Sequence, residues 1–153
     1  MSTTQQPDIS TTLAGIHLKS CIYNASGPRS GNSAALSKIA KSEAGAVLAK
    51  SATLEAQTGN PLPRTWHSPD GAASFNSEGL PNSGIDYYLA ASTIEETMSE
   101  ASGDKPYMVS LSGKSLDDNL EMLRRLAASP SRKQISSIEL NLACPNIIGK
   151  PII

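Results

Sequence analysis

The residues most suited to chemistry lie near the end of the sequence, in the stretch ELNLACPN, where Asn141, Cys144 and Asn146 are separated by only a few positions. A cysteine thiolate is a nucleophile and can also accept a proton, and an asparagine amide carries both a donor and an acceptor. Cysteine more often has a buried structural role. The position of Cys144 between two asparagines, after an apolar segment typical of a buried strand, favours a catalytic role.

Small or polar residues also follow the other apolar segments of the chain. They are NASG at 24–27, KSAT at 50–53 and SLSG at 110–113. Lys50 ends an apolar run, where burying an ammonium group is costly unless its charge is paired; the alternative is that its side chain extends to solvent. Ligands of parallel α/β folds bind at the carboxyl ends of the strands. The sequence therefore predicts one site assembled from several strand ends.

The elements that would position these residues alternate between strand and helix. The patterns predict strands over 21–25, 45–53, 105–113 and 135–142, and helices over 33–45, 85–102 and 115–129. Ser33 and Ser115 are expected N-caps, and Gly45 is an expected C-terminal stop. A small hairpin that leads into the strand over 21–25 is expected within TLAGIHLKSCIYNASG at 12–27, and two short strands joined at SPDG are expected within the polar segment 54–84.

This alternation is typical of parallel β/α architecture. A complete (β/α)8 barrel takes about 250 residues, whereas this chain has 153 residues and four expected sheet strands. We therefore expect an α/β fold: the N-terminal half, about four βα units, of a TIM barrel, with a small N-terminal hairpin and an inserted β-hairpin loop. The expected organisation is a polar tail over 1–11 and a truncated barrel domain over 12–153.

Composition and charge exclude several kinds of partner. The chain is 39% hydrophobic and 18% charged, with a net charge of −1, as in an ordinary globular protein. It has no basic stripe, no spacing typical of metal ligands, no secretory signal and no apolar run of the ~20 residues that span a bilayer. We expect a cytoplasmic protein with no nucleic-acid or membrane partner, in which Cys21 and Cys144 are reduced thiols.

Six short motifs occur in a set order along the chain. Besides NASG and KSAT, they are GNPLPR at 59–64, NSEGLPN at 76–82, DYYL at 86–89 and ELNLACPNIIGKP at 139–151. In this order the motifs resemble the N-terminal half of the class 1A dihydroorotate dehydrogenases, the cytosolic class that uses fumarate. The resemblance implies an FMN enzyme that oxidises dihydroorotate to orotate in pyrimidine (UMP) biosynthesis, with fumarate as the electron acceptor. It also implies a homodimer for the full-length form.

The resemblance implies roles for individual positions. Cys144 matches the catalytic base, which removes a proton from carbon 5 of the substrate while hydride leaves carbon 6 for the flavin. The positions that match flavin contacts are Ala25, Ser26, Gly27, Lys50, Ser51 and Asn141. The positions that match substrate contacts are Lys50, Asn76, Ser77, Glu78, Gly79, Leu80, Asn141 and Asn146. The glycine-rich turn for the FMN phosphate belongs, by the same resemblance, to the other half of the barrel.

Two positions depart from the family pattern. Glu78 stands where methionine is usual and adds a negative charge close to the expected anionic ligand, and Ala143 stands where serine is usual. A flavin-dependent paralogue with another small substrate is therefore an alternative, as is a truncated remnant without catalysis. The related class that uses an iron–sulfur partner subunit is an alternative for the electron acceptor.

Overall fold

The computed structural model describes residues 7–142 and residue 144. At its centre is a parallel three-stranded sheet of order β3-β6-β7. Its strands are β3 (Val47–Leu48), β6 (Tyr107–Leu111) and β7 (Ile135–Leu140). The α-helices among the described residues are α1 (Ser33–Ala40), α2 (Ile85–Leu89), α3 (Ala91–Met98) and α4 (Leu116–Ala128). Strands and helices alternate as the sequence predicts, and the α/β class with a parallel sheet is confirmed.

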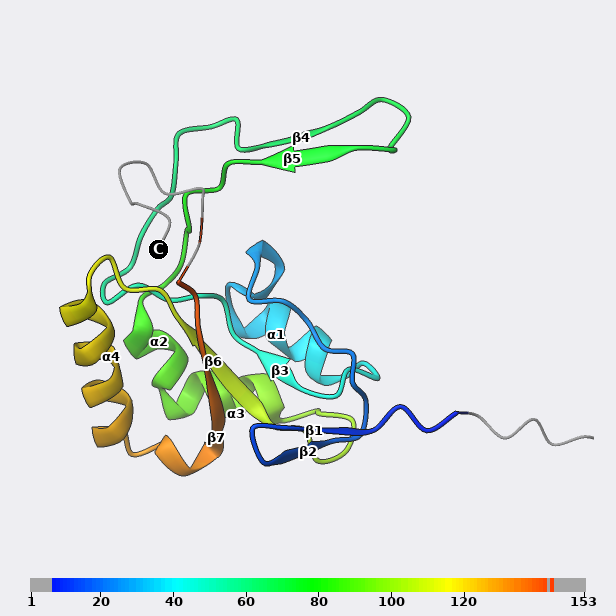
Figure 1. The fold of residues 1–153 in the computed structure, drawn as a ribbon, viewed down its shortest axis with the longest axis vertical. Coiled ribbons are helices and arrows are strands. Elements are labelled where there is room, and N and C mark those ends of the chain that lie inside the picture. The colour runs from blue at the N-terminus through cyan, green and yellow to red at the C-terminus, as the bar shows by residue number, and fades with distance from the viewer. Residues whose placement is uncertain (1–6, 143, 145–153) are drawn as a thin grey trace, which may run out of the picture.

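Two antiparallel hairpins lie at opposite ends of this sheet (Figure 1). One pairs β1 (Thr11–Leu13) with β2 (Ile16–Leu18) near the amino ends of the sheet strands. The other pairs β4 (Thr65–His67) with β5 (Ser74–Asn76) and projects beyond their carboxyl ends. Both predicted hairpins are therefore confirmed, and the second is placed above the edge at which parallel-sheet ligands bind.

The hydrophobic core lies between the sheet and the helices. Leu36 of α1, Tyr88 of α2 and Met122 of α4 are fully buried against strand residues such as Val47 and Val109. Strand β6 is buried along its whole length because it is the central strand of the sheet. No helix in the described part of the chain is both long and apolar enough to cross a bilayer.

The predicted strand over 21–25 is wrong, because this segment has no ladder pairing in the structure. It lies beside β3, but the side chain of Asn24 takes the place of a backbone ladder. Its Nδ2 donates to the carbonyl of Leu48 at 2.6 Å, and its Oδ1 accepts from the Leu48 N–H at 2.9 Å. The segment 21–25 is therefore joined to β3 by an amide side chain instead of a backbone ladder. The periodicity of the sequence could not reveal such a contact.

The single helix predicted over 85–102 is divided into α2 and α3 at Ala90, whose ψ of 132° is extended. A continuous helix would use the carbonyls of Tyr88 and Leu89 as acceptors for the next turn. In the structure the Tyr107 hydroxyl donates to the Tyr88 carbonyl at 3.2 Å, and the Ser129 hydroxyl donates to that of Leu89 at 3.4 Å. Tertiary partners thus satisfy the two carbonyls that the break leaves without helical partners.

The expected boundaries of the first helix are also wrong. Asn32 is the N-cap of α1 in place of Ser33, because its Oδ1 accepts from the Ala35 N–H at 2.9 Å. The helix ends at Ala40, well before Gly45. Gly45 has a different role, since a Cβ there would overlap the backbone carbonyl of Ser20. The cap of α4 is confirmed, with the Ser115 hydroxyl accepting from the Asp118 N–H at 3.1 Å.

Strand β7 is less buried than predicted. Its residues alternate between half-buried and exposed, and Ile138 and Leu140 are 39% and 51% exposed. Among the described residues β7 pairs only with β6, so it is an edge strand whose outer side has no neighbour. The inward positions are better covered, and they include Glu139, which contacts the loops above the sheet.

Candidate active site

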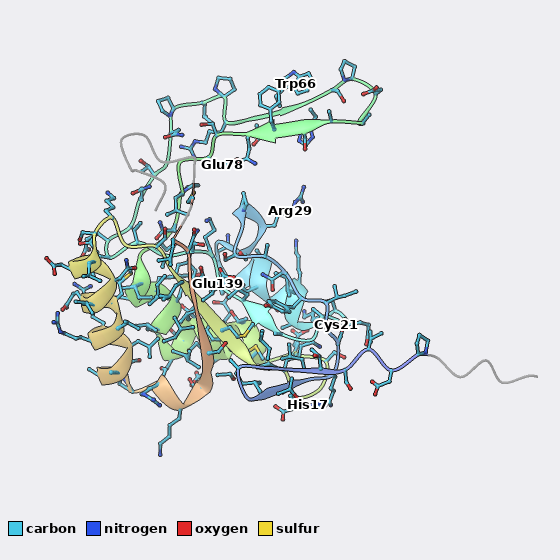
Figure 2. The ribbon with its side chains drawn as sticks, in the orientation of Figure 1. His17, Cys21, Arg29, Trp66, Glu78 and Glu139 are labelled. Atoms are coloured by element: carbon cyan, nitrogen blue, oxygen red, sulfur yellow. The ribbon has the colours of Figure 1, made fainter. Side chains whose placement is uncertain are left out.

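A cavity of about 350 Å³ lies between the carboxyl ends of the strands and the base of the β4–β5 hairpin, within the size range of small-molecule sites. Its lining residues are Ala25, Ser26, Gly27, Pro28, Lys50, Ser51, Asn76, Glu78, Leu80, Asn141 and Cys144. All of these except Pro28 were predicted from the sequence. Figure 2 shows Glu78 at the base of the hairpin, above Glu139 at the end of the sheet.

The cavity is built where the chain leaves the sheet. Lys50 and Ser51 follow β3, and Asn141 and Cys144 follow β7. Ser26 is held against this edge because its carbonyl accepts from the Ser51 N–H at 3.1 Å. Segments far apart in sequence therefore meet at one edge, since parallel strands place their carboxyl ends on the same side.

Lys50 provides a cation in this cavity. Its side chain is buried, with the residue only 4% exposed, so it does not extend to solvent. Its Nζ donates to the Ser26 carbonyl at 3.2 Å. Burial lowers the pKa of Lys50 from its ordinary value, and the negative charges of Cys144, Glu78 and Glu139 oppose that shift. A buried ammonium whose burial is only partly offset by these charges is suited to an anionic ligand.

A network of hydroxyl groups lies beside Lys50. The hydroxyls of Ser26 and Ser110 donate to Glu139 Oε1 at 2.6 and 2.7 Å. The Ser51 hydroxyl lies 2.9 Å from each of these serine oxygens and accepts from Asn141 Nδ2 at 3.0 Å. Sequence reasoning missed Glu139 and Ser110. The available signal was the two-residue spacing of Glu139 and Asn141, which places them on one face of a strand.

The loop after β5 reaches the cavity at Glu78 and Leu80, whereas Gly79 is not among the described lining residues. Gly79 and Leu80 have φ values of +70° and +56°, and Leu80 is an unusual residue for this region. A Cβ at Gly79 would overlap the side chain of Asn60. The Gln57 side chain holds the loop by donating to the Gly79 carbonyl at 2.6 Å. Gly79 is therefore needed for the shape of the loop, whereas Leu80 lines the cavity.

The remaining predicted residues differ in their placement. Ser77 is not among the described lining residues, and its hydroxyl accepts from Asn60 Nδ2 at 3.1 Å. Glu78 lines the cavity, and its Oε1 accepts from the Thr65 hydroxyl at 2.7 Å. Asn146, like the departure at Ala143, lies outside the described residues. The structure thus brings together the cation, amide and thiol groups of three chain segments.

Comparison with known proteins identifies the family of the chain. The family model for dihydroorotate dehydrogenase matches residues 8–153. The chain belongs to the dihydroorotate dehydrogenase family. It is 38% identical to the dihydroorotate dehydrogenase (fumarate) of Trypanosoma brucei brucei and 40% identical to dihydroorotate dehydrogenase A (fumarate) of Lactococcus lactis subsp. lactis. Each match covers 94% of this chain and 44% of the relative, so the chain spans less than half the length of these dihydroorotate dehydrogenases.

Solved structures of dihydroorotate dehydrogenases share the fold. The enzyme from Eimeria tenella in complex with ferulenol superposes with a TM-score of 0.71 at 20% sequence identity, over 97% of this chain and 40% of that chain. The ligand-free form from the same organism gives a TM-score of 0.70 at 21% identity, over 96% and 41% of the two chains. At these identities the likeness establishes the fold of the chain and nothing about its ligands.

Proposed function

We propose that the chain is the N-terminal half, about four βα units over residues 12–153, of the TIM barrel of a fumarate-type dihydroorotate dehydrogenase. The full protein would oxidise dihydroorotate to orotate with FMN in pyrimidine biosynthesis and pass the electrons to fumarate, as a cytoplasmic homodimer. The observation that carries this proposal is the burial of Lys50 in one cavity with Asn141 and Cys144. These are the cation, the amide and the base that an anionic dihydropyrimidine requires.

The described residues fit the ring system of FMN. Ala25, Ser26 and Gly27 form one wall of the cavity and carry small side chains or none. A Cβ added at Gly27 would meet no atom within 4 Å, so a flat ring can lie close to this backbone. Lys50, Ser51 and Asn141 supply polar groups at the same cavity. FMN, when bound, supplies the acceptor for the hydride of the substrate.

The other groups of the cavity act on the substrate. Lys50 holds the substrate carboxylate, and the amides of Asn76, Asn141 and Asn146, with the loop of Ser77, Glu78, Gly79 and Leu80, orient the ring. Cys144 accepts the proton from carbon 5 at its Sγ, and hydride departs from carbon 6. The two losses convert a carbon–carbon single bond into a double bond.

Glu78 supports a second candidate function. Its carboxylate lines the cavity, is held there by Thr65, and acts on the charge of Lys50. A negative charge beside the cation weakens the site for an anion, which favours a flavin-dependent paralogue with a less anionic small substrate. Binding constants for orotate and for its uncharged amide, measured side by side, distinguish the two functions.

To test the proposal, the full-length, FMN-loaded protein is mixed with dihydroorotate under anaerobic conditions. The rate of flavin reduction is measured as the loss of flavin absorbance. Replacement of a general base costs about 10²–10⁴-fold in rate, so Cys144→Ala is expected to slow flavin reduction by that factor while FMN still binds. Cys21→Ala is the matched control, because Cys21 is exposed and lies away from the site (Figure 2). Near-normal reduction in the Cys144 variant would overturn the assignment.

A further inference from the structure

We propose that Glu139 is a positioning residue, which acts through a chain of serine hydroxyls to fix the side-chain amide of Asn141 with its oxygen available to the cavity. The site would then select ligands that present an N–H donor at that point. This inference rests on the proposed function for the nature of the ligand, a cyclic amide, but its structural part stands on the hydrogen bonds of the described residues.

The contacts to Glu139 are short. Its Oε1 accepts from the Ser26 hydroxyl at 2.6 Å and from the Ser110 hydroxyl at 2.7 Å. Distances of about 2.5–2.7 Å are typical of hydroxyl groups that donate to a carboxylate, and such bonds are about twice as strong as neutral ones. Ser110 is completely buried, so water does not compete for its hydroxyl. The carboxylate therefore determines where these two protons lie.

Proton counting extends this constraint to Asn141. A carboxylate only accepts, so Ser26 and Ser110 each use their single proton on Glu139. The Ser51 oxygen lies 2.9 Å from both serine oxygens and can donate its own proton to only one of them. In the structure Ser51 donates its proton to Ser26, so its oxygen accepts from Asn141, whose Nδ2 lies 3.0 Å away.

The direction of this hydrogen bond decides which atom of the Asn141 amide is available to the cavity. With Nδ2 directed at Ser51, the Oδ1 atom of Asn141 is an acceptor, and no donor within the described part of the chain is recorded for it. The hydrogen bond recorded for Lys50 Nζ is to the Ser26 carbonyl and not to Asn141. A ligand N–H, such as that of a dihydropyrimidine ring, completes this acceptor. A ligand that places a carbonyl oxygen there meets electrostatic repulsion.

The test reverses the direction of the hydrogen bonds that link Glu139 to Asn141. Glu139→Gln can supply an NH₂ group that donates to Ser26 and Ser110, whose protons then turn toward Ser51. Ser51 donates to Asn141 in that arrangement, which turns Oδ1 away from the cavity. We expect the variant of the full-length, FMN-loaded protein to bind orotate at least tenfold more weakly. We also expect a large shift of the Asn141 side-chain amide signals in ¹⁵N NMR spectra, which needs no turnover.

Three controls separate positioning from a general structural role. Glu139→Asp retains the acceptor and is expected to restore most of the orotate affinity. Glu96→Gln makes the same chemical change at an exposed residue of α3 and is expected to have no effect. Ser51→Ala interrupts the chain, so adding Glu139→Gln to it is expected to change orotate binding less than twofold.

The outcomes are distinct. The inference is overturned if Glu139→Gln leaves both the Asn141 amide signals and the orotate constant unchanged, or if it lowers the urea midpoint while orotate binding is unaffected. If the unmodified protein binds FMN but not orotate, yet the Asn141 signals respond to Glu139→Gln, the positioning role stands and the proposed substrate is wrong.

Discussion

Replacing Lys50 with methionine separates a ligand-binding role of the buried cation from a role in folding. Lys50 is 4% exposed, and within the described part of the chain its Nζ has one recorded hydrogen bond, to the Ser26 carbonyl at 3.2 Å. Removing a hydrogen bond to a charged group costs about 1.5–3 kcal/mol. Removing the ammonium also relieves the cost of burying a charge, which is several kcal/mol per ion. Since methionine retains an unbranched apolar stem, we expect the free energy of unfolding to stay within about 1 kcal/mol or to increase.

Orotate binding, unlike stability, is expected to be weakened by Lys50→Met. Loss of a charge-assisted hydrogen bond of about 1.5–3 kcal/mol to a carboxylate corresponds to about 10- to 150-fold weaker binding. Orotate titration of the FMN-loaded, full-length protein measures the binding constant, and urea denaturation measures stability. Lys38→Met, at an exposed position of α1, is the matched control. Unchanged orotate binding together with destabilisation by several kcal/mol would refute the reasoning and assign Lys50 to the fold.

Three further predictions concern pH, charge and backbone pairing. Burial lowers the pKa of Lys50 below 10.5, so orotate affinity should fall as the pH rises through that lowered pKa. The free energy of unfolding should rise between the lowered pKa and pH 10.5, because only the unfolded chain is still protonated at Lys50 in that range. Neither trend should occur in Lys50→Met. Glu78→Met should tighten orotate binding about 2- to 5-fold, because removing repulsion between the Glu78 carboxylate and orotate is worth ~0.5–1 kcal/mol for partly exposed charges. An unchanged dissociation constant would mean that Glu78 does not interact with the ligand. Asn24→Ala should lower the free energy of unfolding by about 2–4 kcal/mol, because it leaves the N–H and carbonyl of buried Leu48 without partners; a urea midpoint equal to that of the unmodified chain would contradict this.

Local patterns were sufficient for much of the architecture. The alternation of apolar runs and amphipathic segments predicted the parallel α/β class, and turn residues around SPDG predicted the β4–β5 hairpin. Ser115 was recognisable as a cap because an N-cap needs only its own next three residues. The candidate site was also accessible, because the carboxyl ends of parallel strands meet at one edge, so residues such as Lys50 and Asn141 could be grouped without coordinates.

Only the tertiary structure decided the features that depend on residues distant in sequence. The break at Ala90 leaves carbonyls that Tyr107 and Ser129 satisfy from other elements. The pairing of 21–25 with β3 uses the amide of Asn24 instead of a ladder. The two partners of Glu139, Ser26 and Ser110, come from separate segments of the chain. Sequence periodicity records which face of an element is apolar, but hydrogen bonds between distant polar groups follow from their distances after folding, and these only the packed chain determines.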